Sequence, residues 1–132
     1  MSFSLDSRFT TFLQGTAGVS HQVELRTRMS IPQPFPYQGS KRKIADIIIA
    51  QLPDDVDTLI EPFAGSAAIS VAAAYKAKAQ HFVLNDVNAP LMTLWSEIIN
   101  QPDWLATQYE HLWTAQRGRE KKYYFTIRDE FN

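Results

Sequence analysis

Two short apolar runs in the middle of the chain predict buried strands. Residues 57–61 are centred on Leu59 and Ile60, and residues 81–85 have the sequence His-Phe-Val-Leu-Asn. Between them, residues 67–79 are rich in alanine, isoleucine and valine, which suits a helix packed on a sheet. The order strand, helix, strand is typical of a parallel pair joined by a crossover helix, so the pattern predicts an α/β fold.

Apolar residues at helical spacing predict further helices outside this segment. The first begins at Ser40 and stops at Pro53. Its inward face consists of Ile44, Ala45, Ile48 and Leu52. Asn88 caps the second, with Pro90 in its first turn. Its core-facing positions are Leu91, Leu94, Trp95, Ile98 and Ile99. We expect Trp95 in the core rather than stacked on a ligand.

Two more helices are predicted near the carboxyl end. Asp103 caps one of them, and the other begins at about Arg119. The inward stripe of the first consists of Leu105, Tyr109, Leu112 and Trp113. That of the second consists of Tyr123, Tyr124, Ile127 and Phe131. A basic run there forms either a phosphate-contacting patch or, as is usual for such runs, a solvated face. Its members are Arg117, Arg119, Lys121 and Lys122.

Residues 1–33 differ from the rest of the chain. They show no sustained periodicity and no apolar run long enough for a signal peptide or a membrane span. Met29 is a candidate initiator, which makes the first 28 residues an optional extension; we prefer this interpretation to a functional arm. Arg26 and Arg28 are candidates for DNA contact, although two arginines in a tail are usually solvated.

Gly65 stands where the first strand turns sharply into its helix. A residue without Cβ permits positive φ and lets a ligand approach the backbone. Ser66 is the candidate N-cap of that helix, and Asp86 follows the carboxyl end of the second strand. In α/β sheets ligands lie outside the carboxyl ends of the strands, and an acid roughly 20 positions after the glycine commonly accepts ribose hydroxyls. The pattern predicts a pocket for a nucleotide-type cofactor.

The kind of cofactor depends on what surrounds this glycine. Ala67 and Ser70 occupy places where a dinucleotide-binding loop has further glycines, which argues against a pyrophosphate. S-adenosylmethionine has no phosphate, but its carboxylate needs a cation. Lys41 is the candidate, because Lys41, Arg42 and Lys43 crowd a helix start that disfavours cations unless an anion is near. The alternative is a solvated basic end.

Three motifs in this order resemble the DNA adenine-N6 methyltransferases of the Dam type. The first pairs an aromatic residue, a glycine and a lysine, here Tyr37, Gly39 and Lys41. The second is acidic-Pro-Phe-x-Gly, here Glu61, Pro62, Phe63 and Gly65. The third is an acid followed two places later by asparagine, here Asp86 and Asn88. The resemblance covers about residues 34–132, with Ala67 in place of a frequent second glycine and Tyr37 in place of a common tryptophan.

The resemblance implies roles for these residues in binding S-adenosylmethionine. Tyr37 flanks the cofactor, Lys41 pairs with its carboxylate, Gly65 admits it and Asp86 holds its ribose. Glu61 and Phe63 lie at the pocket, with a purely structural role as the alternative for each. Ala67 is tolerable if its backbone is helical and crowds the cofactor if its φ is positive.

The implied fold is an incomplete Rossmann-like methyltransferase fold followed by the start of a helical DNA-binding subdomain. We therefore expect an N-terminal extension over residues 1–33 and a cofactor-binding α/β part over 34–102. Residues 103–132 are expected to form a helical segment that leads toward target recognition.

The catalytic motif of the family, an acid or amide followed by Pro-Pro and an aromatic residue, is not present. The chain has seven prolines and no two are adjacent. We therefore assign no catalytic residue and expect no methyl transfer by this chain alone. A truncated gene, a cloned fragment or a split enzyme with a complementary C-terminal chain would give this pattern. The alternatives to a methyltransferase are an interaction module for a second, catalytic chain and an unrelated nucleotide-binding α/β protein.

Composition adds a few expectations about the partners, metals and location of the protein. The net charge is −1 with a pI near 6.3, so any contact with double-stranded DNA is expected to be local. Zero cysteines exclude a disulfide framework and agree with a cytoplasmic protein, bacterial or phage-encoded by the resemblance. The three histidines have no ligand-like spacing, so we expect no metal, and we expect no membrane association. The resemblance leaves three biological roles open, namely restriction-modification, repair and phage biology.

Overall fold

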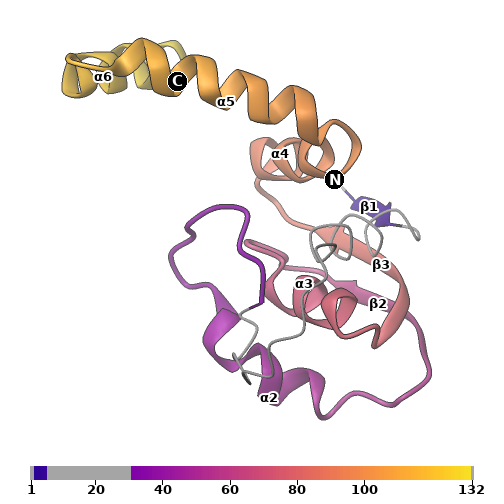
Figure 1. Ribbon diagram of the computed structural model, residues 1–132. Helices are drawn as coiled ribbons and strands as arrows, with labels where there is room; N and C mark the ends of the chain where they lie inside the picture. Colours follow the sequence, from indigo (N-terminus) through magenta and orange to yellow (C-terminus); the bar gives the residue numbers. More distant parts are fainter. Residues whose placement is uncertain (1, 6–30, 132) are drawn as a thin grey trace, which may run out of the picture. The chain divides into compact units, whose positions relative to one another are not determined.

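The computed structural model describes residues 2–5 and 31–131 and shows a mixed α/β protein (Figure 1). The chain divides into two compact units, residues 1–99 and residues 100–132, which are described separately. Within the described ranges, no helix is both long and apolar enough to cross a membrane.

The first unit is built on the predicted parallel strand pair. Strands β2 (Val56–Glu61) and β3 (Ala79–Asn85) pair in parallel from Val56 opposite Ala79 to Glu61 opposite Leu84. Helix α3 (Ala68–Tyr75) is the crossover between them. Both strands run in the same direction, so their carboxyl ends lie at one edge of the sheet, as the sequence predicted.

A third strand, β1 (Ser2–Leu5), was not expected from the sequence. It pairs antiparallel with β3, with Ser2 opposite Asn85 and Leu5 opposite Phe82, which gives the order β1-β3-β2. Figure 1 shows β3 between its two neighbours. The sequence analysis predicted no strand within residues 1–33, so it missed β1. Arg26, Arg28 and Met29 lie outside the described residues.

Helix α3 is shorter than the predicted span of 67–79 because left-handed alanines stand at both its ends. Ala67 (φ 45°) precedes it and Ala77 (φ 52°) follows it. After the helix, the Lys78 N–H donates to the Ala73 carbonyl at 2.8 Å and the Ala77 N–H to the Ala74 carbonyl at 3.1 Å. These two bonds are a Schellman motif, which ends the helix before β3 begins.

The helix predicted from Ser40 starts as a 3₁₀ turn, η1 (Lys41–Ile44), and continues as α2 (Ala45–Ile49). Ala45 and Ile49 are buried, whereas Ile44 is 44% exposed and Ile48 is half-buried. The predicted inward face is thus wrong in part. A 3₁₀ turn has 3.0 residues per turn instead of 3.6, and this rotates the side chains before it relative to those after it.

Helix α4 (Ala89–Asn100) confirms the predicted cap and the predicted core position. The Leu91 N–H donates to Asn88 Oδ1 at 3.2 Å. Trp95 is 1% exposed and belongs to the core. Of the other predicted inward residues Leu91 and Ile98 are buried, and Met92 is buried in addition.

The second unit contains α5 (Pro102–Gln116) and α6 (Glu120–Phe131). Gln101 occupies the N-cap position of α5 and Pro102 is its first residue, so Asp103 lies in the first turn and is not the cap. No residue of either helix is buried, and the predicted inward stripes stay largely exposed. This outcome corrects the prediction, and it has a simple cause, since two helices alone cover only the seam between them.

Candidate cofactor site

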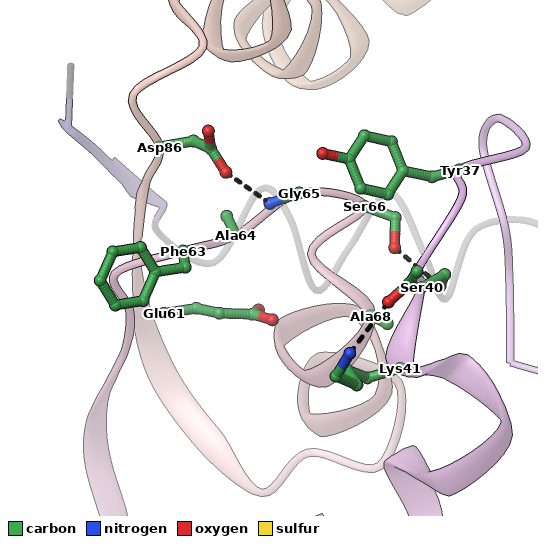
Figure 2. Close-up of a pocket in the computed structure, with 11 residues that line it drawn as sticks. Tyr37, Ser40, Lys41, Glu61, Phe63, Ala64, Gly65, Ser66, Ala68 and Asp86 are labelled. Atoms are coloured by element: carbon green, nitrogen blue, oxygen red, sulfur yellow. Dashed lines mark hydrogen bonds between the residues drawn. The ribbon is translucent and has the colours of Figure 1, made fainter.

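A hollow of about 330 Å³ lies at the carboxyl ends of β2 and β3 (Figure 2). It contains each cofactor-binding candidate that the sequence analysis named. Its lining residues are Tyr37, Gly39, Ser40, Lys41, Glu61, Phe63, Ala64, Gly65, Ser66, Ala68 and Asp86. Its volume is at the small end of the range for ligand sites, about 300 to 1,000 Å³.

Asp86 joins the two loops that leave the strands. Its Oδ2 accepts the Gly65 N–H at 2.9 Å and its Oδ1 accepts the Asn88 N–H at 3.0 Å. These backbone donors, that of Asn88 first and that of Gly65 second, lower the pKa of the Asp86 carboxyl. The carboxylate therefore stays ionised at neutral pH. Each of its oxygens has two lone pairs, so each retains acceptor capacity toward a ligand.

Gly65 is held in a conformation that suits a residue without Cβ. Its φ is 50°, and a Cβ added there would lie 2.9 Å from Cε1 of Tyr37. The Tyr37 ring thus lies against the Gly65 backbone, as Figure 2 shows. The aromatic residue and the glycine, 28 positions apart in the sequence, form one wall of the hollow.

Ser66 has a different role from the predicted N-cap. Its hydroxyl donates to Ser40 Oγ at 2.8 Å, which ties the glycine loop to the turn before η1. Ala67 occupies the N-cap position, without a side-chain cap bond. Its φ is positive, yet its side chain is fully buried and it does not line the hollow. The cost of alanine there is backbone strain, about 1–2 kcal/mol, and not crowding of the hollow.

Glu61 takes over the capping of α3. Its Oε2 accepts the Ser70 N–H at 3.0 Å and the Ser70 hydroxyl at 2.6 Å. Desolvation by burial raises the pKa of Glu61, and the hydrogen bonds from Ser70 oppose that rise. Glu61 thus lines the hollow while its carboxylate faces the first turn of α3, an arrangement that the helix dipole favours.

Replacing Glu61 with glutamine is expected to flatten the pH dependence of stability. A raised carboxyl pKa means that the folded state binds more protons than the unfolded state. The unfolding free energy of the parent should therefore fall as pH rises from the ordinary value of 4.5 through the raised pKa. Glu61→Gln keeps an acceptor for Ser70 without a titrating charge, so its unfolding free energy should stay level over that interval.

Urea denaturation at several pH values between 4 and 8 measures this difference. The exposed Glu110→Gln is the control and should follow the parent profile. Glu61→Ala removes the cap, and its unfolding free energy should lie about 1 kcal/mol below that of Glu61→Gln at every pH. Parallel profiles for the parent and Glu61→Gln would contradict the assigned burial of an ionisable carboxyl.

The basic residues near the hollow separate into different roles. Arg42 donates from Nε to the Ile31 carbonyl at 2.8 Å and from Nη1 to Gln33 at 3.2 Å, so it anchors the segment before Tyr37. Lys41 lines the hollow, and its Nζ donates to the Gly39 carbonyl at 3.1 Å. Of the three basic residues in the turn, Lys41 alone lines the hollow.

Phe63 and the loop behind it form the rim on the β2 side. The Phe63 side chain is 88% exposed, so it is not held by the core. Behind it, Asn85 Nδ2 donates to the Pro62 carbonyl at 3.1 Å and the Ala64 N–H donates to the Asn85 carbonyl at 2.9 Å. The sequence analysis missed Ser40 as a lining residue and Asn85 as a residue that supports the rim; the strand-end position of Asn85 was the available signal.

A parallel strand pair with a glycine turn and an acidic strand end places the chain among α/β proteins whose ligand site lies at the carboxyl edge of the sheet. Residues 37–132 match the model of the D12 class N6 adenine-specific DNA methyltransferases, and the chain belongs to that family. The resemblance inferred from the three motifs is confirmed.

A curated relative is the "DNA adenine methylase" of Haemophilus influenzae, which is 26% identical over 101 residues. The match covers 76% of this chain and 34% of the relative, so the chain spans about a third of that protein's length. No solved structure matches the chain significantly.

Proposed function

We propose that this chain provides the S-adenosylmethionine-binding part of an enzyme that methylates adenine N6 in DNA, on an incomplete Rossmann-like fold. The observation that carries the proposal is the Asp86–Gly65 hydrogen bond, which closes a hollow at the carboxyl edge of a parallel sheet in a chain of this family. The proposed binding residues are Tyr37, Lys41, Glu61, Phe63, Gly65 and Asp86.

The hollow has the features that this cofactor requires. Asp86 is an ionised acceptor for ribose hydroxyls, and Gly65 lines the hollow beside it without a side chain that would fill the space. Lys41 supplies a cation for the carboxylate of the amino-acid group. Tyr37 offers an aromatic face, and Phe63 adds apolar surface at the rim.

When bound, the cofactor supplies an electrophilic methyl group. The residues of this chain orient it: Asp86 and Gly65 fix one end, and Lys41 restrains the other. Acceptors that orient the adenine amine, and a site for a base taken out of the duplex, are required as well. We assign these to a protein part beyond these 132 residues, either a continuation or a complementary chain, because the acid-Pro-Pro-aromatic motif is not among them.

The second unit is the proposed DNA-facing part. Lys121 and Lys122 are exposed on α6, whereas Arg119 donates to the Ala115 carbonyl at 2.9 Å and lies 5.2 Å from the centroid of the Tyr123 ring. Contacts from the lysines to phosphates would be local, given the net charge of −1. The proposed location is the cytoplasm, where bacterial or phage DNA is the substrate.

Calorimetry on the full chain tests the proposed function. S-adenosylmethionine and its demethylated product S-adenosylhomocysteine are expected to bind, while ATP and NAD are expected not to compete. Binding of ATP with displacement by inorganic phosphate would favour the nucleotide-binding alternative. A folded chain that binds none of these ligands would contradict the proposal.

Lys41→Ala is expected to weaken S-adenosylmethionine binding about 5-fold, because an ion pair to a partly exposed carboxylate contributes on the order of 1 kcal/mol. 5′-Methylthioadenosine lacks that carboxylate, so its affinity should not change. Lys43→Ala, on the same turn but outside the lining of the hollow, is the matched control. An equal loss of affinity for both ligands would mean that Lys41 does not contact the carboxylate.

A further inference from the structure

Side chains from two later segments of the chain form hydrogen bonds with both polar backbone groups of Gly65. Its N–H donates to Asp86, 21 positions later in the chain, at 2.9 Å. Its carbonyl oxygen accepts the indole Nε1–H of Trp95, 30 positions later, also at 2.9 Å. Glycine has many accessible backbone conformations, and these two bonds select one of them.

Trp95 is also connected, through Phe35, to Tyr37 in the same wall of the hollow. Its ring lies 5.5 Å from the ring of Phe35, centroid to centroid. Phe35 meets Tyr37 edge to face at 6.4 Å, and Tyr37 lies against Gly65. The contacts therefore form a closed circuit from Gly65 through Trp95, Phe35 and Tyr37 back to Gly65.

The burial of Trp95 shows that its contacts with Gly65 and Phe35 are not contacts with a ligand. Trp95 is 1% exposed and does not line the hollow, so it does not touch a ligand directly. A buried indole N–H needs an acceptor, and here the acceptor is the backbone of the ligand site. A phenylalanine would fill most of the same apolar space without making that bond.

We propose that Trp95 is a positioning residue for the cofactor site. It fixes the plane of the Gly65–Ser66 peptide through the indole N–H and the ring of Tyr37 through Phe35. Because the C=O and N–H of one trans peptide point in opposite directions, a carbonyl directed at Trp95 aims the Ser66 N–H away from it. The inference rests on the proposed function insofar as the ligand is S-adenosylmethionine.

Trp95→Phe in the full chain tests the proposal with two measurements. In the ligand-free protein, the NMR amide resonances of Gly65 and Ser66 should shift, and the Gly65 amide should exchange with solvent faster. In calorimetry well below the unfolding midpoint, the affinity for S-adenosylmethionine should fall about 5-fold, the effect of one lost hydrogen bond. Trp104→Phe and Trp113→Phe, at exposed positions of α5, are controls and should change neither quantity.

Phe35→Leu is the second variant and serves if Trp95→Phe does not fold. It keeps the indole bond and breaks the aromatic link, so the Tyr37 ring resonances should shift and the affinity should fall about 2-fold. Variants that unfold more easily while the Gly65, Ser66 and Tyr37 resonances and the affinity stay unchanged would reduce Trp95 to a core filler and overturn the proposal.

A parent chain that does not bind the cofactor would count against the proposed function alone. The amide measurements on the ligand-free protein would still decide whether Trp95 sets the conformation of the loop.

Discussion

Asp86→Ala is expected to abolish measurable binding of S-adenosylmethionine, with a loss of at least about 100-fold. The carboxylate is the proposed acceptor for the ribose, and hydrogen bonds to a charged group contribute about 1.5–3 kcal/mol each. The same substitution leaves the N–H groups of Gly65 and Asn88 without their acceptor, so the two loops that Asp86 joins lose their link. Calorimetry measures the loss.

Two further variants test whether binding depends on the charge of the Asp86 side chain or only on its size. Asp86→Asn keeps the size of the side chain, but its amide NH₂ must face one of the two backbone N–H donors, so binding should remain at least about 10-fold weaker than in the parent. Asp55→Ala, at an exposed position before β2, should bind like the parent. Circular dichroism shows whether each variant is folded. A folded Asp86→Ala that binds normally would remove Asp86 from the site.

The lowered pKa of Asp86 adds a pH expectation to this result. A depressed carboxyl pKa stabilises the fold at all pH values above the ordinary value of 3.8 and ceases to do so as pH falls through the lowered pKa. Between pH 5 and 8 the binding contributed by Asp86 should therefore be constant.

Gly65→Ala is the second substitution with a large expected effect, a loss of binding of about 10- to 100-fold. The added Cβ would lie 2.9 Å from Cε1 and 3.3 Å from Cζ of Tyr37, so the ring must move from the wall of the hollow. Left-handed alanine also costs about 1–2 kcal/mol in stability. The steric effect should appear in ligand affinity, and the backbone effect should appear in the unfolding free energy.

Gly118→Ala is the matched control for backbone strain. Gly118 has φ 76° and nothing within 4 Å of an added Cβ, and it lies outside the hollow. It should lose a similar amount of stability and no affinity. The double variant Gly65→Ala with Tyr37→Leu removes the collision as well as the aromatic wall, so it should show no further loss beyond Tyr37→Leu alone. Unchanged affinity in Gly65→Ala would mean that the ligand does not approach this turn.

The sequence predicted those features that depend on residues close together in the chain. The strand pair, the cap at Asn88 and the core position of Trp95 each depend on a few neighbouring residues. The span of α3 was overestimated because Ala67 and Ala77 count as favourable for a helix by residue type, although their backbone lies outside it. Residue type alone does not reveal a left-handed alanine.

The sequence analysis missed strand β1 and two hydrogen bonds, because these depend on contacts between distant parts of the chain. The alternation Ser-Phe-Ser-Leu in β1 is only four residues long, too short to distinguish a strand from chance. The bonds of Glu61 to Ser70 and of Trp95 to Gly65 arise from the tertiary fold, which brings separate elements together. The motifs predicted which residues gather at the hollow, but not which of them hold one another.

Among the strands that the structure describes, β3 is the interior strand, because β1 pairs with it antiparallel on the side away from β2, and β2 lies at an edge. The end of β3, which leads into Asp86, is therefore braced from two sides. The end of β2, which leads into Pro62 and the exposed Phe63, is braced from one side. We therefore expect the Phe63 side of the hollow to deform more readily than the Asp86 side when a ligand enters.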